Sequence, residues 1–290
     1  MKRRAAATLA VLALVVAGCH SKVKPTPPAG KPTATLLVTR NFGAGILLAK
    51  RVASGQTVMT ALRAVAPVDT RYGGRFVQSI EGISGSLAHE KDWTYFVNGL
   101  EARVGATDVT LHAGDRVWWD FRPWADLPTV PAVIGSFPEP FVHGTGRKQA
   151  QVEVRGSDAL LAALRHDGAR AGHAASSWRV IVGSDASLRG DPAYRRATSS
   201  PLAAGVTVSV RDGHVVGYAG QGMLAPIPTA RAAIFAIRAN GGATLFVAGV
   251  DAAAARAAAA ALAAHPTIAQ HHYAMALDAR GRVVGQVGGG

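Results

Sequence analysis

Asp92–Gly99 reads DWTYFVNG, which places three aromatic side chains within four positions, directly before an Asn-Gly pair. Alternating apolar residues followed by Asn-Gly are typical of a β-strand that enters a tight hairpin turn. Large aromatic side chains are costly to leave in water, so a strand with aromatics on both faces needs a cover on each side. The stretch predicts a sheet strand with one face on a core and the other open to a ligand or to another part of the chain.

The residues around this strand predict a small mixed sheet wrapped on one helix. TATLLVTR at 33–40 and GILLAKRV at 45–52 are short β-rich runs, and the residues between them predict a hairpin. From Val58 the apolar residues follow helical spacing, with Thr57 as the N-cap, and VWWDF at 117–121 predicts the last strand. The order of the elements is that of a β-grasp.

A set of motifs in this region resembles a known family. The motifs are GQTV at 55–58, ALR at 61–63, YGGRFVQSIEGI at 72–83, WTYFVNGLEA at 93–102 and GATDVTLHAGDRVWWDF at 105–121. Together they resemble the bacterial domain related to the C-terminal β-grasp domain of transcobalamin and intrinsic factor. The resemblance implies a β-grasp domain over about residues 33–124. In the vertebrate carriers that domain closes over cobalamin, so the resemblance also implies a binding module, with a cobalamin-like ligand as one candidate.

Period-2 alternation assigns the aromatic side chains to two faces. Val117 and Trp119 share one face of their strand and should cover the helix, which leaves Trp118 on the open face. Either a flat ligand or the second domain could cover that open face. The candidate ligand-binding residues are Tyr72, Trp93, Tyr95, Trp118 and Trp124.

The N-terminus predicts export and a lipid anchor. A cationic MKRR start and an apolar run end in Val-Ala-Gly before Cys19, the single Cys of the chain, and this pattern resembles the bacterial lipobox. Residues 1–18 are therefore expected to be a lipoprotein signal peptide. Residues 19–32 are expected to be a Pro/Lys tether that starts at the lipidated Cys19. The expected location is the extracytoplasmic face of the cell membrane.

The charge balance of the sequence bears on whether the protein binds nucleic acid. Lys and Arg outnumber Asp and Glu 31 to 18, giving a formal charge of +13. The Arg residues are scattered rather than clustered, and an exported chain does not meet cytoplasmic nucleic acid, so we expect no nucleic-acid partner.

Two further segments follow the first domain. Residues 125–148 are rich in Pro and Gly and predict a linker, or an extended arm that lies on a domain. Residues 149–290 alternate strands and helices and predict an α+β domain. VIVGSD with RDGHVVG and LFVAGVD with ARGRVVG look like two copies about 67 residues apart, which suggests ferredoxin-like halves that share one sheet.

No motif indicates catalysis or a metal site. HExxH, GxSxG, paired Cys and the calcium-loop pattern are all missing from the sequence, so we expect a non-enzymatic protein without a metal. The favoured function is a lipoprotein that captures a small flat or cofactor-like ligand on the aromatic β-grasp face. The alternative is an envelope module that binds a protein or a glycan. A hydrolase that uses the second domain is a third hypothesis.

Overall fold

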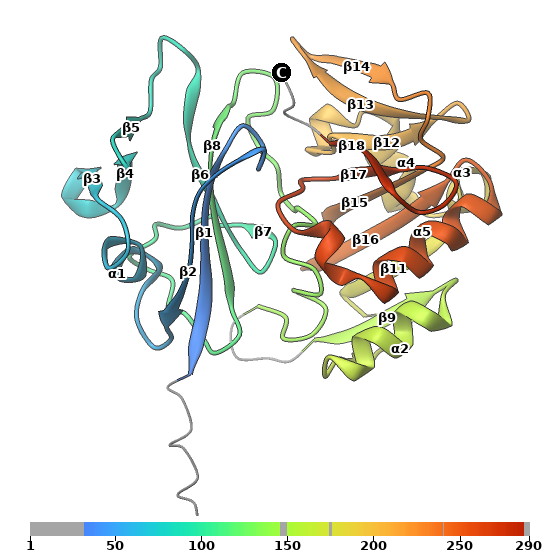
Figure 1. The fold of residues 1–290 in the computed structure, drawn as a ribbon, viewed down its shortest axis with the longest axis horizontal. Coiled ribbons are helices and arrows are strands. Elements are labelled where there is room, and N and C mark those ends of the chain that lie inside the picture. Colours follow the sequence, from blue (N-terminus) through green and yellow to red (C-terminus); the bar gives the residue numbers. More distant parts are fainter. Residues whose placement is uncertain (1–31, 146–149, 174–175, 240, 287–290) are drawn as a thin grey trace, which may run out of the picture. The chain divides into compact units, whose positions relative to one another are not determined.

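The β-grasp sheet prediction is confirmed in outline by the computed structural model, which describes residues 32–145, 150–173, 176–239 and 241–286. Cys19, the signal peptide and nearly all of the tether lie outside these residues. Five strands pair in the order β2–β1–β8–β6–β7, with β1 and β8 parallel and the other neighbours antiparallel (Figure 1). They are β1 (Thr33–Arg40), β2 (Gly45–Ala53), β6 (Lys91–Val97), β7 (Leu100–Glu101) and β8 (Arg116–Pro123).

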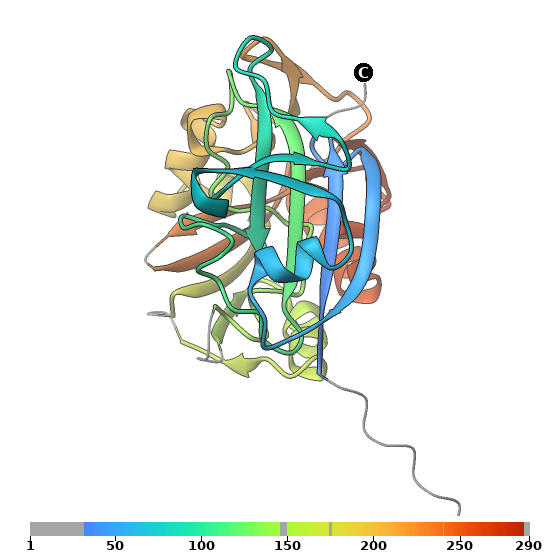
Figure 2. The same cartoon turned by 90° about the vertical axis from the view of Figure 1, so that its left-hand side faces the viewer.

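One short helix, α1 (Val58–Arg63), covers one face of this sheet (Figure 2). The Thr57 hydroxyl accepts a hydrogen bond from the Thr60 N–H, which is the predicted N-cap. The buried face of the helix packs in one cluster with Leu36, Val38 and Trp119 of the sheet. Each large side chain removed from water here contributes about 1.5–3 kcal/mol.

The segment after α1 contains a strand over residues 76–80, and this strand belongs to a separate small sheet. Its partners are its sequence neighbours, so the hairpins close locally before the chain returns to the main sheet. The elements are β3 (Val68–Arg71), the short helix η1 (Tyr72–Gly74), β4 (Phe76–Ile80) and β5 (Ile83–Ser84).

Residues 125–145 form an arm that packs along the protein. Val133 and Ile134 are almost fully buried, as are Phe137 and Phe141. The Val133 N–H donates to Gly99 O at 2.8 Å, and the Ile134 N–H donates to Tyr273 O at 3.2 Å. The arm therefore joins the turn after β6 to a loop of the second half.

A seven-stranded mixed sheet forms the second half, in the order β10–β9–β11–β16–β15–β17–β18. β9, β11 and β16 are parallel neighbours, whereas β15, β17 and β18 pair antiparallel. The strands are β9 (Gln151–Arg155), β10 (Arg170–Ala171), β11 (Trp178–Ser184), β15 (Ala232–Ala239), β16 (Gly242–Gly249), β17 (Met275–Leu277) and β18 (Val283–Gln286).

Both faces of this sheet are covered, as its nearly continuous apolar strands require. On one face, α2 and α5 pack on Val180 and Leu245. On the other, α4 and β12 pack on Ile181 and Phe246. The covering elements are α2 (Asp158–His166), α3 (Asp185–Leu188), α4 (Pro192–Ser199), η2 (Leu202–Ala204), β12 (Val208–Arg211), β13 (His214–Gly220), β14 (Met223–Pro226), α5 (Ala252–Ala264) and η3 (Pro266–Ala269).

The two sequence copies occupy equivalent places only in part. Their first strands, β11 and β16, are parallel neighbours with Val180 opposite Leu245. The β17–β18 hairpin joins the large sheet, but the β12–β13 hairpin pairs with β14 in a sheet of its own. The fold is α+β as predicted. It differs from two halves sharing one sheet because β12–β13 lies across the sheet face, where its valines cover Phe235 and Phe246.

Among the described residues, no helix combines the length and the apolar character needed to cross a bilayer.

Candidate functional site

The sheet face opposite α1 is where the two halves of the protein meet. Phe96 and Trp118 of this face belong to one buried cluster with Tyr273 and Phe235 of the second half. The Trp118 ring centroid lies 5.1 Å from that of Tyr273 and 5.7 Å from that of Phe96. The second half therefore covers most of this face, one of the two covers considered for the aromatic strand.

Small residues allow this close approach. A Cβ added to Gly135 in the arm would lie 2.5 Å from Trp118 Cζ3, closer than carbon atoms pack. Gly43, in the β1–β2 turn with φ of +90°, leaves no space for a Cβ beside the His271 carbonyl. Glycine is required at Gly43 for its backbone angle as well as for space.

A hydrogen-bonded carboxylate lies behind Trp118. Asp120 is fully buried, and its oxygens accept from Thr39 Oγ1 at 2.5 Å, Tyr273 Oη at 3.0 Å and the Phe42 N–H at 3.0 Å. The Gly43 N–H donates to it as well, at 3.2 Å. Burial raises the pKa of Asp120 to about 6, although the hydrogen bonds from Thr39 and Tyr273 oppose this shift. Trp118 Nε1 donates to Thr39 Oγ1 at 2.7 Å, so the network also fixes the indole.

Arg122 is a second buried charge on the same face. It is 1% exposed, and its Nη1 donates to the Leu127 carbonyl in the arm. Its Nε and Nη2 atoms have no hydrogen-bond partner among the described residues, and Nη2 lies 3.9 Å from Glu101 Oε1. Asp120 and Arg122 therefore place two charged groups in the buried part of this face, whereas the face under α1 packs in an apolar cluster.

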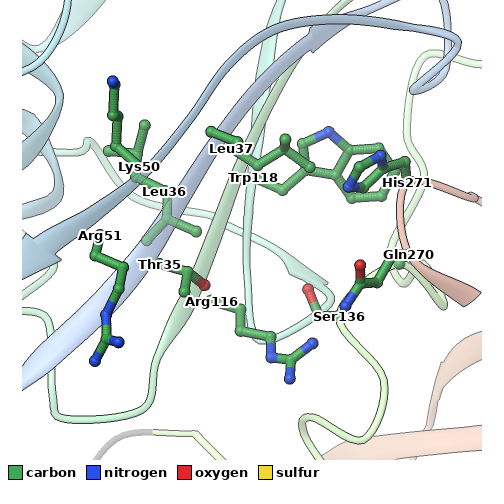
Figure 3. A pocket seen from close by; sticks show the side chains of 13 residues that line it. Thr35, Leu36, Leu37, Lys50, Arg51, Arg116, Trp118, Ser136, Gln270 and His271 are labelled. Atoms are coloured by element: carbon green, nitrogen blue, oxygen red, sulfur yellow. The ribbon is translucent and has the colours of Figure 1, made fainter. Parts of the chain in front are cut away.

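A pocket of about 370 Å³ opens at the edge of this interface (Figure 3). Strands β1, β2 and β8 form its floor, and the arm and the loop before β17 form its far wall. The residues that line it are Thr35, Leu36, Leu37, Ala49, Lys50, Arg51, Arg116, Val117, Trp118, Gly135, Ser136, Gln270 and His271.

Strand register explains how the floor is built. Thr35 of β1 is opposite Arg51 of β2 and Arg116 of β8, so these three residues form one row across the sheet. Two residues further along, Leu37 is opposite Ala49 and Trp118, and they form a second row on the same face. The floor therefore has a basic row next to an apolar and aromatic row.

The lining residues that the structure describes include no carboxylate. Arg51 Nη2 donates to Thr33 Oγ1 at 2.8 Å, and Arg116 Nη1 donates to the Phe137 carbonyl at 3.1 Å. These bonds hold both guanidinium groups without neutralising them. Burial lowers the pKa of His271, so the imidazole is mainly neutral near pH 7 and can donate or accept a hydrogen bond.

The predicted site residues do not all gather at this pocket. Trp118 lines it while being 2% exposed, since most of the ring lies under the second half. Trp93 and Tyr95 lie on the opposite face, in the cluster that packs on α1, where Tyr95 stacks on Trp119 with ring centroids 4.6 Å apart. The expectation that they share a ligand face with Trp118 is therefore corrected. Side chains alternate along β6, so Phe96 and not Tyr95 is the neighbour of Trp118.

The other two predicted residues also lie apart from Trp118. Tyr72 is 79% exposed in η1 and lines a separate groove of about 460 Å³ with Phe76 and Leu87. Trp124 follows β8, is half-buried and does not line the pocket beside Trp118.

Sequence reasoning missed the basic row and the far wall of the pocket. Arg51, Thr35 and Arg116 come together only through strand register, and Ser136, Gln270 and His271 come from segments far along the chain. One signal was available for Arg51 and Thr35, because the predicted hairpin places strands 33–40 and 45–52 side by side.

Among the described residues, no group of three or more His, Cys, Asp or Glu side chains is placed to hold a metal ion.

Comparison with known proteins gives a local match. A family model described as a domain of unknown function (DUF4430) matches residues 55–122. The search of curated proteins found no match.

Two solved structures share a small part of the chain. One is haptocorrin in complex with Cbi, at 13% identity and a TM-score of 0.27, covering 31% of this chain and 24% of haptocorrin. The other is a candidate metal-binding protein from Ruminococcus gnavus, at 9% identity and a TM-score of 0.28, covering 32% of this chain and 98% of that one. The matched family region begins after the β1–β2 hairpin. It therefore includes Arg116 and Trp118 of the pocket but neither Thr35 nor Arg51.

Proposed function

We propose that this protein is a lipid-anchored, extracytoplasmic binding protein that captures a small molecule in the pocket beside Trp118. The observation that carries the proposal is a pocket of about 370 Å³, within the usual size of small-molecule sites, built by both halves of the protein. A site at the junction of two structural units, with a few polar groups beside an apolar surface, is a usual setting for ligand binding. We propose binding without catalysis.

The ligand we propose has a flat part that lies along Leu37 and the edge of Trp118. A corrinoid is the candidate that the family resemblance suggests. The pocket is at the lower end of the size range for drug-sized ligands, so it favours a smaller molecule or one part of a corrinoid. Both kinds of ligand belong in the test.

The test is a thermal-unfolding screen of the full chain in detergent, with cobinamide, cobalamin and small aromatic molecules. A ligand that binds only the folded state at a concentration 100 times its Kd stabilises the fold by about 2.7 kcal/mol, which raises Tm measurably. Ala49→Trp fills the pocket from the exposed edge strand β2. Ile46→Trp is its matched control, because Ile46 is exposed on β2 outside the pocket. We expect ligands that raise Tm in the wild type and in Ile46→Trp but not in Ala49→Trp. If no ligand shows this pattern, the proposal fails.

The alternative function, an envelope module for a protein or a glycan, has its own supporting observation. Tyr72, Phe76 and Leu87 expose apolar surface around the separate groove beside β4. Aromatic side chains on an open surface suit both sugar rings and protein partners. A glycan array, together with crosslinking of the wild type and of Tyr72→Ala in envelope preparations, tests this alternative.

The membrane partner is proposed from Cys19 alone. Metabolic labelling with a radioactive fatty acid should label the wild type and not Cys19→Ser. Equal labelling of both chains would exclude the anchor.

A further inference from the structure

The charged side chains that line the pocket indicate the chemical class of the flat small molecule proposed above. This step rests on the proposed function. In the described part of the chain, the pocket lining contains the cationic side chains Lys50, Arg51 and Arg116 and no carboxylate. Among the described residues, none of the three forms an ion pair with an acidic side chain of this chain. Other arginines, such as Arg179 and Arg231, do have acidic partners.

The position of the two arginines is set by the sheet. Neighbouring strands lie about 4.8 Å apart, so Arg51 and Arg116 start about 10 Å apart with Thr35 midway between them. Long side chains can close that distance onto a single acid group held above the Thr35 hydroxyl. In Figure 3 the guanidinium groups of Arg51 and Arg116 lie on either side of Thr35, whereas Lys50 extends in another direction.

Guanidinium groups suit an acid group better than ammonium groups do, because they donate two parallel hydrogen bonds to a carboxylate or a phosphate. Arg116 is the better placed of the two, since it is half-buried and its Nη1 is held by the Phe137 carbonyl. Ser136 and Gln270 line the same pocket on its far wall, and both carry side-chain groups that can form hydrogen bonds with a ligand (Figure 3).

The apolar and aromatic row of the floor indicates what the rest of the ligand should be like. Ala49, Leu37 and the edge of Trp118 form an apolar strip directly beside the basic row. We infer that the ligand is a small organic anion: a flat apolar body on this strip, with a carboxylate or phosphate group on Arg116, Arg51 and Thr35. A carboxylic acid and a phosphate monoester share this chemistry.

Calorimetric titration of the full chain in detergent tests the inference with three matched probes. They are 2-naphthoate, its neutral isostere 2-naphthamide, and 2-naphthyl phosphate. Comparing the naphthoate with the phosphate shows whether the site prefers a carboxylate or a phosphate group. We expect at least one anion to bind at one site, with 2-naphthamide about 10- to 100-fold weaker, the difference made by charge-assisted hydrogen bonds. Arg116→Gln should weaken the anion about tenfold or more and leave the amide unchanged. Arg256→Gln, an exposed arginine on α5, is the matched control.

The outcomes separate this inference from the proposed function. If the amide and the anions bind equally and Ala49→Trp abolishes both, the pocket binds ligands but the anion inference is overturned. If the anions bind equally to Arg116→Gln and to the wild type, the inference is also overturned. If neither the probes nor the corrinoids bind, the proposed function fails first. Preference for the phosphate over the carboxylate, or the reverse, would support the inference and identify the acid group.

Discussion

The two faces of the five-stranded sheet are stabilised in different ways. The face under α1 is packed by an apolar cluster in which Tyr95 stacks on Trp119. The face toward the second half buries Asp120 and Arg122, together with the hydroxyl groups of Thr39 and Tyr273. The stability that apolar packing provides does not depend on pH, and an apolar core accepts side chains of different shape when their total volume is kept. The stability of a buried polar network depends on pH and on the geometry of its hydrogen bonds. The first face holds the domain together, and the second face fixes where the two halves meet.

The largest expected effect is on the apolar face. Trp119→Ala removes a ring that is 3% exposed and stacked on Tyr95, so it leaves a large cavity under α1. The free energy of unfolding should fall by about 3–5 kcal/mol. Urea denaturation measures it. A loss below about 1 kcal/mol would contradict the view that this face holds the domain together.

The next effect is on the polar face. Asp120→Asn places an amide NH₂ where N–H and O–H groups donate, so the free energy of unfolding should fall by about 2–4 kcal/mol at pH 8. Urea denaturation of both chains at pH 8 and at pH 4.5 checks this value and its dependence on pH.

The pH dependence has a definite sign. The pKa of Asp120 is raised from 3.8 to about 6, so the folded chain binds this proton more tightly than the unfolded chain does. The contribution that the raised pKa of Asp120 makes to the free energy of unfolding of the wild type is therefore lost as pH rises from about 4 to about 6. Asp120→Asn lacks this dependence, so the gap between the two chains should widen by about 2 kcal/mol from pH 8 to pH 4.5. A gap that narrows on acidification would mean that the hydrogen bonds, and not burial, set the pKa of Asp120.

A smaller effect is expected where the halves approach closely. Gly135→Ala pushes a methyl group against Trp118 and the His272 carbonyl, so the arm must shift. Overpacking of this kind should lower the free energy of unfolding by about 1–3 kcal/mol. Gly213→Ala cannot serve as the control, because Gly213 has a φ of +76° and an alanine there would be strained. The control is Ala263→Ser, on the partly buried side of α5. If Gly135→Ala has no effect on stability or on Trp118 fluorescence, the contact is loose.

The smallest effect is expected outside both faces. Tyr72 is 79% exposed, so Tyr72→Ala should change the free energy of unfolding by less than about 0.5 kcal/mol. Urea denaturation again measures it. A larger loss would mean that the β3–β5 sheet depends on the Tyr72–Phe76 ring contact.

The sequence was most informative where local rules decide structure. The hairpin about Asn41–Gly45, the Thr57 cap and the face assignment of Trp119 are correct because each depends on residues within a few positions.

What could not be predicted depends on distant partners. Trp118 was assigned to the right face, but its cover, Tyr273, lies in the second half of the chain. Asp120 and Tyr273 are 153 positions apart, so nothing near Asp120 indicates that its carboxylate is buried. Trp93 and Tyr95 were placed on a ligand face because aromatic content alone does not show which face the helix covers.

The position of β1 has a mechanical consequence. The described chain enters β1 directly at Thr33, and β1 is an inner strand, hydrogen-bonded to β2 on one side and β8 on the other. In a chain tethered at its N-terminus, a pull along β1 loads both ladders at once in shear. Many hydrogen bonds then share the force, instead of opening one after another as they do when an edge strand is peeled away. An inner first strand therefore resists a pull at its N-terminal end better than an edge strand would.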